Sequence, residues 1–244
     1  MLGLRASPLS LLVDSREYAG GRTLRWFHGM RYRERPLMDY SRLRWYPDIT
    51  ATYRLTAACL VPAGLLPLAR LSVSGLENVP LTGPVILAAN HRDNWDAFLL
   101  LHLVGRYVHF AARPDGFGTG SLCAVWRRLG AFPANGWGIR YALNLLADGG
   151  AVGLFPQGMI SKELATPSGA AGVLALHSGA PVVPIAIEGT EAVHVGSMFT
   201  RRANVRVRFG APLAFSRDSS NATRSRAVAH AILDQIRALL AVDD

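Results

Sequence analysis

The sequence is poor in lysine and in cysteine. Lys162 is the only lysine, so arginine supplies almost all of the basic residues behind the formal net charge of +9. An arginine bias of this kind is also what a GC-rich genome produces. The two cysteines, Cys59 and Cys123, belong to no C-x-x-C or other metal-binding spacing. Because both lie in apolar contexts, we expect buried free thiols, with no metal and no redox cofactor.

The sequence also lacks a secretory leader pattern and an evident transmembrane helix. The apolar run "LTAACLVPAGLLPLA", residues 55–69, has fifteen residues, whereas a membrane-spanning helix needs roughly 20. Pro62 and Pro67 interrupt it and would break a regular helix. The run therefore predicts a helical segment over residues 51–70 that lies at a membrane interface. A plain core helix is the alternative.

The N-terminal part of the chain is basic and shows little periodicity. Residues 1–54 hold ten arginines against five acidic residues. A basic segment beside an apolar one attracts anionic lipid headgroups, by about 1 kcal/mol per basic residue near the surface. Nucleic acid would be attracted as well, but no nucleic-acid-binding motif is present. Residues 1–50 are thus predicted to be a poorly structured extension, and Met38 is an alternative start that would exclude residues 1–37.

From Arg70 onward, short apolar or β-branched runs alternate with stretches typical of helices. This alternation predicts an α/β domain over residues 71–244, with a mostly parallel twisted sheet flanked by helices. The strands are almost continuously apolar, which indicates burial on both faces of the sheet. The expected strands are 70–73, 85–89, 107–112, 151–155, 182–187 and 204–209, and the expected helices lie near 95–105, 119–129, 139–149, 168–178 and 222–241.

Three of the expected strands end in polar or conformationally special residues. Asn90 and His91 follow the strand at 85–89, "FPQG" (155–158) follows "AVGL", and "EGTE" (188–191) follows "VVPIAI". In sheets of this class, functional sites gather at the carboxyl ends of the strands. The three stretches are therefore the first candidates for a site.

His91 and Asp96 stand five residues apart at the first of these strand ends. Histidine is the usual general base near neutral pH, and a carboxylate partner fixes its tautomer and stabilises the imidazolium. No serine or cysteine lies in this stretch, so the substrate would supply the hydroxyl. A histidine that merely caps the turn is the alternative. The other six histidines are interpreted as structural or surface residues: His28, His102, His109, His177, His194 and His230.

The stretch "GLENVPLTGPVILAANHRDNWDAFLL" resembles the opening of the 1-acylglycerol-3-phosphate O-acyltransferase family, with its N-H-x-x-x-x-D motif at Asn90, His91 and Asp96. The family's F-P-E-G-T-R-S block corresponds to "FPQGMIS" (155–161). Its V-P-(I/V)-x-(I/P) block corresponds to "PVVPIAIEG", with Pro184 at the matching place. The resemblance covers roughly residues 52–215.

The resemblance implies a mechanism and a setting. The histidine would deprotonate a hydroxyl of a lysolipid acceptor, the aspartate would orient it, and the alkoxide would attack the thioester of acyl-CoA or acyl carrier protein. Backbone N–H groups of Gln157 and Gly158 are expected oxyanion donors. No metal or other cofactor is expected. The resemblance also implies a peripheral or monotopic protein of phospholipid biosynthesis, on the cytoplasmic face of the cell membrane.

Several positions depart from the family pattern. The family also has a G-x-x-x-x-x-R block. Counted from Gly130 in "GAFPANGWGIR", its arginine position is Gly136, and Arg140 follows four residues later. In "FPQGMIS", Gln157, Met159 and Ile160 replace the glutamate, threonine and arginine of the F-P-E-G-T-R-S block. An acceptor without a phosphomonoester, such as a lyso-aminolipid or a glycolipid, would explain these changes. A catalytically degenerate lipid-binding protein is the alternative. The predicted catalytic pair is His91 and Asp96, and the predicted substrate contacts are Asn90, Asp93, Arg140, Phe155, Pro156, Gln157, Gly158 and Lys162.

Overall fold

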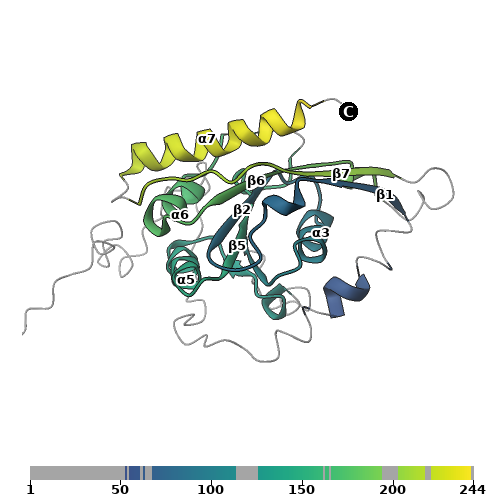
Figure 1. The fold of residues 1–244 in the computed structure, drawn as a ribbon, viewed down its shortest axis with the longest axis horizontal. Helices are drawn as coiled ribbons and strands as arrows, with labels where there is room; N and C mark the ends of the chain where they lie inside the picture. Colours follow the sequence, from purple (N-terminus) through teal and green to yellow (C-terminus); the bar gives the residue numbers. More distant parts are fainter. Residues whose placement is uncertain are drawn as a thin grey trace, which may run out of the picture.

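A computed structural model describes most of the chain after the basic extension (Figure 1). The predictions made for the extension, for Cys123, for Lys162 and for most of the helix near 119–129 lie outside the described residues. The described residues are 53, 55–60, 63, 68–113, 126–161, 163–164, 166–193, 203–217 and 221–242.

The centre of the fold is a seven-stranded sheet with the order β1-β7-β6-β2-β5-β3-β4. All neighbouring strands are parallel except β6 and β7, which are antiparallel. The predicted mostly parallel α/β sheet is therefore confirmed. The strands are β1 (Ala69–Ser74), β2 (Val85–Ala89), β3 (Val108–Ala112), β4 (Phe132–Pro133), β5 (Ala151–Leu154), β6 (Val182–Glu188) and β7 (Ala203–Phe209).

Helices cover both faces of this sheet, and α7 and α3 lie on opposite sides of it in Figure 1. On one face, α5 (Gly136–Ala147), α6 (Ala170–Ser178) and α7 (Ala222–Leu240) pack against buried side chains such as Ile86 and Val152. On the other face, α3 (Trp95–Leu103) packs against Leu87 and Val183. Successive residues of β2 thus point into different layers of the core, as the pleat of a strand requires.

Side-chain caps determine where two of the helices begin. Asn135 accepts a hydrogen bond from the Gly138 amide at the start of α5, and Asn221 accepts one from the Arg224 amide at the start of α7. Each amide oxygen satisfies a main-chain donor that has no partner within its own helix. The cap on α5 fixes how the chain leaves β4.

The segment before β1 packs on the α3 face. Tyr53 is buried; its hydroxyl donates to the Arg106 carbonyl oxygen (2.9 Å) and accepts from the Val108 amide (3.2 Å). His102 donates to the carbonyl oxygen of Ala57 (2.7 Å), in the short π-helix η3 (Thr56–Leu60). This packing leaves Cys59 on the outer side of the segment, so the expectation that its thiol is buried is wrong. No helix of the described residues is long and apolar enough to span a membrane.

Candidate active site

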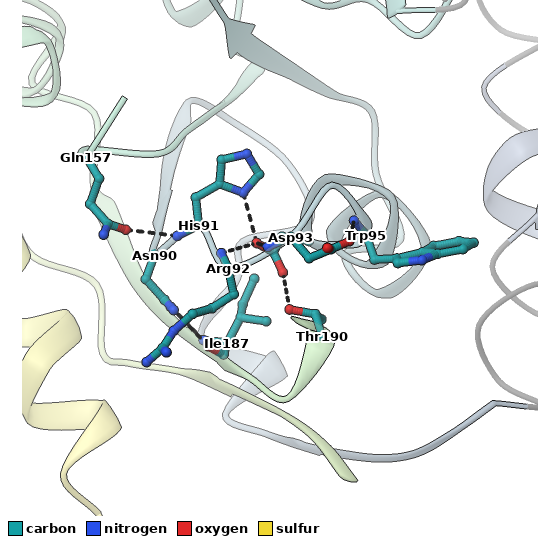
Figure 2. A network of polar contacts seen from close by, with 9 residues as sticks. Asn90, His91, Arg92, Asp93, Trp95, Gln157, Ile187 and Thr190 are labelled. Carbon is teal, nitrogen blue, oxygen red and sulfur yellow. Dashed lines mark hydrogen bonds and ion pairs between the residues drawn. The ribbon is translucent and has the colours of Figure 1, made fainter. Parts of the chain in front are cut away.

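The three strand ends singled out in the sequence meet at one edge of the sheet, because β2 lies between β5 and β6. Asn90 joins two of them (Figure 2). Its side chain is 1% exposed, donates to the Ile187 carbonyl oxygen and accepts from the Ile187 amide, both at 2.7 Å. The amide therefore extends the pairing of β2 with β6 and fixes the direction in which the chain continues into His91. Its predicted contact with substrate stays a prediction.

His91 and Asp96 are in direct contact. The Nδ1 atom of His91 lies 2.8 Å from Oδ2 of Asp96, whose side chain is fully buried, while the His91 side chain is 16% exposed. A carboxylate only accepts hydrogen bonds, so Nδ1 is the donor and the neutral ring carries its lone pair on Nε2. Figure 2 shows the ring reaching away from this contact. Nε2 of His91 is therefore a hydrogen-bond acceptor at the edge of the sheet, as a general base requires.

The loop between β2 and α3 is wrapped around the Asp96 carboxylate. Besides His91, Oδ2 accepts hydrogen bonds from the amides of Arg92 (2.6 Å) and Asp93 (2.9 Å). Asp96 also lies in the first turn of α3, where the helix dipole favours a negative charge. These donors stabilise a buried anion, and the step of five residues follows from the size of this loop.

Asp93 has a local structural contact. Its Oδ1 accepts from the Trp95 amide at 3.0 Å, which ties the start of α3 to the loop. The Asp93 side chain therefore supports the loop that holds Asp96. Its predicted contact with the acceptor stays a prediction.

The third predicted element of the site, the "FPQG" loop, is attached to His91 at several points. The Phe155 ring stacks on the His91 ring, with centroids 3.9 Å apart and planes inclined by 9°. The buried Gln157 side chain accepts from the His91 amide (2.9 Å) and donates to the carbonyl oxygen of Glu163 (2.7 Å). The Ser161 amide in turn donates to the His91 carbonyl oxygen at 2.9 Å. Ring plane and backbone of His91 are thus both fixed by this loop.

The Gly158 amide, one of the expected oxyanion donors, has a hydrogen-bond partner within its own loop. The Gly158 amide donates to the carbonyl oxygen of Phe155 at 2.9 Å, which closes a tight turn. Gly158 has a φ of 71°, a conformation that glycine adopts without strain. Pro156 is buried, and its carbonyl oxygen accepts from the Ser168 amide. Glycine and proline therefore shape the turn, while the expected role of the Gln157 amide as an oxyanion donor stays a prediction.

Arg140 is the positively charged candidate that the structure describes, and its contacts lie away from His91. Arg140 lies on α5 with its guanidinium 5.6 Å from the centre of the Trp137 ring. No hydrogen bond, ion pair or ring contact among the described residues joins Arg140 to His91 or Gln157. Ile160, 46% exposed, is the neighbour of Ser161 and so lies close to His91. An exposed apolar side chain therefore occupies the place where the family resemblance implies an arginine.

Thr190 completes the site, and the sequence reasoning missed its role. Its hydroxyl donates to Oδ1 of Asp96 at 2.6 Å, the dashed contact at the end of β6 in Figure 2. Arg92 and Glu191 form an ion pair between the same two loops, at 3.8 Å. In the sequence, the one signal for Thr190 is that "EGTE" (188–191) follows a predicted strand. This signal predicts that Thr190 lies at the edge of the sheet, but it does not predict the contact with Asp96.

The sequence pattern that defines a family described as Acyltransferase matches residues 70–188. The matched stretch begins in β1, ends at the last residue of β6 and includes His91, Asp96 and the "FPQG" loop. This stretch of the chain is therefore similar to the acyltransferase family. The matched stretch thus includes the residues that the fold gathers at one edge of its sheet.

Two curated proteins that are similar to this chain carry an informative name. The chloroplastic 1-acyl-sn-glycerol-3-phosphate acyltransferase LPAT1 of Arabidopsis thaliana is 27% identical over 161 residues, covering 61% of this chain and 45% of that protein. The 1-acyl-sn-glycerol-3-phosphate acyltransferase of Bacillus subtilis (strain 168) is 24% identical over 143 residues, covering 56% and 70%. The match thus spans less than half the length of the plant protein.

A solved structure shares the fold. It is the crystal structure of the 1-acyl-sn-glycerophosphate (LPA) acyltransferase PlsC from Thermotoga maritima, with a TM-score of 0.58. The match covers 80% of this chain and 81% of that chain at 20% sequence identity. At this identity the likeness concerns the architecture alone.

Proposed function

We propose that this chain transfers a fatty acyl group from an acyl thioester to the hydroxyl of a lysolipid or a related lipid acceptor. The observation that supports this most is His91, whose ring is fixed between the Asp96 carboxylate and the Phe155 ring with Nε2 on the free side. The family and the names of the relatives agree with this chemistry.

In the proposed reaction, Nε2 of His91 takes the proton of the acceptor hydroxyl. The alkoxide oxygen adds to the thioester carbonyl, the C–S bond breaks, and an ester C–O bond remains. The leaving thiolate receives the proton from the imidazolium, so the histidine returns to its neutral form. Asp96 stabilises the imidazolium between these steps. His91 is thus base and then acid within one cycle.

Direct attack by the acceptor fits the surroundings of the histidine. Within the described part of the chain, no serine or cysteine side chain is hydrogen-bonded to the His91 ring, so no enzyme nucleophile is activated there. The thioester is already an activated acyl donor, and the reaction as written needs neither a metal nor a redox cofactor. Acyl-CoA and acyl carrier protein both supply such a thioester.

The acceptor that we propose lacks a phosphomonoester. A phosphate site relies on charge-assisted hydrogen bonds, which are roughly twice as strong as neutral ones. Here Ile160 is apolar and exposed, and the Gln157 side chain is used within the fold. A lyso-aminolipid or a lysoglycolipid therefore fits this edge of the sheet better than the 1-acyl-sn-glycerol-3-phosphate named for the relatives.

We also propose that the protein works as a peripheral or monotopic protein at the cytoplasmic face of the cell membrane. Its acceptor is a lipid, and acyl thioesters are made in the cytoplasm. The outer side of the segment before β1 carries Leu55, which is 64% exposed, and Cys59. Exposed apolar residues that follow a basic extension in the sequence suit the interface of an anionic membrane.

The test is an acyl-transfer assay with the purified full chain. Labelled acyl-CoA and labelled acyl carrier protein are each offered with lysophosphatidic acid, a lyso-aminolipid and a lysoglycolipid in mixed micelles. Transfer to an acceptor without a phosphomonoester is the expected result. A preference for lysophosphatidic acid would overturn the acceptor assignment alone. If no donor–acceptor pair gives transfer or thioester cleavage, the result favours a lipid-binding protein without activity.

A further inference from the structure

The second oxygen of the Asp96 carboxylate has a partner from a distant part of the chain. The hydroxyl of Thr190 donates to Oδ1 at 2.6 Å, and both residues are 0% exposed. The two residues are 94 positions apart in the sequence. The contact therefore joins the start of α3 to the end of β6 inside the protein, out of reach of any substrate.

The donors around the carboxylate are unequally distributed. Oδ2 accepts from His91, from the Arg92 amide and from the Asp93 amide. Among the described residues, Thr190 is the one donor to Oδ1. Without its hydroxyl, Oδ1 would be a buried charged oxygen with no hydrogen bond, and the carboxylate would gain by rotating toward other donors. Such a rotation would move Oδ2 off the line to the His91 ring.

The position of Thr190 is itself well determined. Gly189 has a φ of 83°, and a Cβ there would lie 1.9 Å from the carbonyl oxygen of Asn204, so the chain turns tightly against β7. The short 3-10 helix η6 (Thr190–Ala192) follows, closed by the Val193 amide on the Thr190 carbonyl oxygen. The hydroxyl is thus presented to Asp96 by a rigid turn.

We infer that Thr190 is a positioning residue for His91: it holds the Asp96 carboxylate in the rotation that keeps Oδ2 on Nδ1. The inference rests on the proposed acyl transfer for its effect on rate. The hydroxyl contacts neither the acceptor nor the thioester. Its loss therefore lowers the rate of the chemical step and leaves substrate binding unchanged.

The kinetic test compares Thr190→Val, which keeps the shape and removes the hydroxyl, with Thr190→Ser, which keeps the hydroxyl. For Thr190→Val we expect kcat to fall by roughly 10- to 100-fold, as for other groups that orient a functional side chain, with KM unchanged for both substrates. Thr190→Ser retains kcat within about threefold. The control is Ser178→Ala, which removes a hydroxyl bonded to the Leu174 carbonyl oxygen of α6. An unchanged kcat in Thr190→Val would overturn the inference.

A second measurement does not depend on activity. Proton NMR detects the His91 Nδ1–H, which is identified by its absence in His91→Gln. In Thr190→Val we expect this resonance to move upfield and to exchange faster with water, while Thr190→Ser and Ser178→Ala keep it. If the chain transfers no acyl group but the resonance behaves this way, the proposed function fails and the positioning by Thr190 stands. An unaltered resonance in Thr190→Val would contradict the positioning.

Discussion

At the scale of single residues, the contacts around His91 hold its ring and its backbone in one orientation. Asp96 fixes one ring nitrogen, Phe155 fixes the ring plane, and Gln157 and Ser161 hold the backbone on either side. A base held in this way does not have to be ordered when the acceptor arrives. Ile160 precedes Ser161 and is exposed, so a change at this position can alter the contact with the acceptor and leave the contacts of His91 in place.

Ile160→Arg tests the acceptor assignment. The side chain is 46% exposed, so an arginine can be placed there without disturbing the core. One charge-assisted hydrogen bond to a phosphate should raise kcat/KM for lysophosphatidic acid by roughly 10- to 100-fold relative to a lysoglycolipid. The measurement is the ratio of the two kcat/KM values, with Ile160→Leu as the control. An unchanged ratio would show that this position does not face the acceptor headgroup.

His109, on β3, gives a prediction about stability and pH. Burial lowers the pKa of its imidazole from 6.5 to about 4, and Nδ1 donates to the carbonyl oxygen of Gly130. Between these two pH values only the unfolded chain binds the proton, so the free energy of unfolding falls as pH decreases, by up to about 1.4 kcal/mol per pH unit. His109→Gln should make this dependence shallower in urea melts at pH 6.5 and 4.5.

The same melts contain their own check on this prediction. All other titrating groups are common to the two proteins, so the difference between their pH slopes reports His109 alone. Equal slopes for the wild type and His109→Gln would contradict a buried neutral imidazole.

At the scale of elements, the close approach of α6 and α7 depends on a missing side chain. A Cβ on Gly172 would lie 1.9 Å from the carbonyl oxygen of Ser225, whereas the nearest atom to a Cβ on Gly169 is 4.0 Å away. Gly172→Ala should therefore lower the free energy of unfolding by about 1–3 kcal/mol, the usual cost of overpacking. Denaturant melts measure this.

Gly169→Ala is the matched control. Gly169 precedes α6 with a φ of −65°, which alanine adopts freely. Alanine there should be neutral or stabilise by up to about 1 kcal/mol, because it restricts the unfolded chain. Equal destabilisation by the two alanines would mean that α6 and α7 do not pack as closely as described.

The elements also show what a sequence can and cannot predict. The expected strand at 85–89 has the same bounds as β2, because a continuous apolar run between turn residues leaves few alternatives. β4 has two residues, one of them proline, and so carries no periodicity. The His91–Asp96 contact was predictable because one loop forms it. Thr190 was not, since its contact depends on the order of β2 and β6 in the sheet.

Gly158 illustrates another limit of reading a motif. The glycine lies in a tight turn, and this turn uses the amide that was expected to bind the oxyanion. The sequence specifies that the chain must bend at this point. It does not specify which N–H groups remain free after the bend.

At the scale of the whole molecule, the sheet separates two layers with different tasks. The layer of α5, α6 and α7 is a packed core, while the α3 layer holds the site's carboxylate and receives the segment before β1. Tyr53 and Ala57 attach that segment through hydrogen bonds to Arg106, Val108 and His102. The apolar surface left outside is therefore held in a fixed place on the domain.

Leu55→Asp tests whether this surface contacts the membrane. Leu55 is 64% exposed, and burying a leucine side chain in lipid is worth roughly 1.5–3 kcal/mol. The change should weaken binding to anionic vesicles by roughly tenfold or more, as measured by co-sedimentation. Leu81→Asp, at a position that is 72% exposed between η4 (Leu76–Asn78) and β2, is the control. Equal weakening by both variants would argue against a specific membrane contact at Leu55.

The central claim is that the proposed transfer depends on His91 as its base. The most direct measurement is the rate of acyl transfer by His91→Ala in the full chain, with its fold checked by circular dichroism and thermal melting. A loss of at least about 10²-fold in kcat, with the fold intact, is the result expected for removal of a general base. A folded His91→Ala protein that transfers acyl groups within about threefold of the wild-type rate would contradict the account.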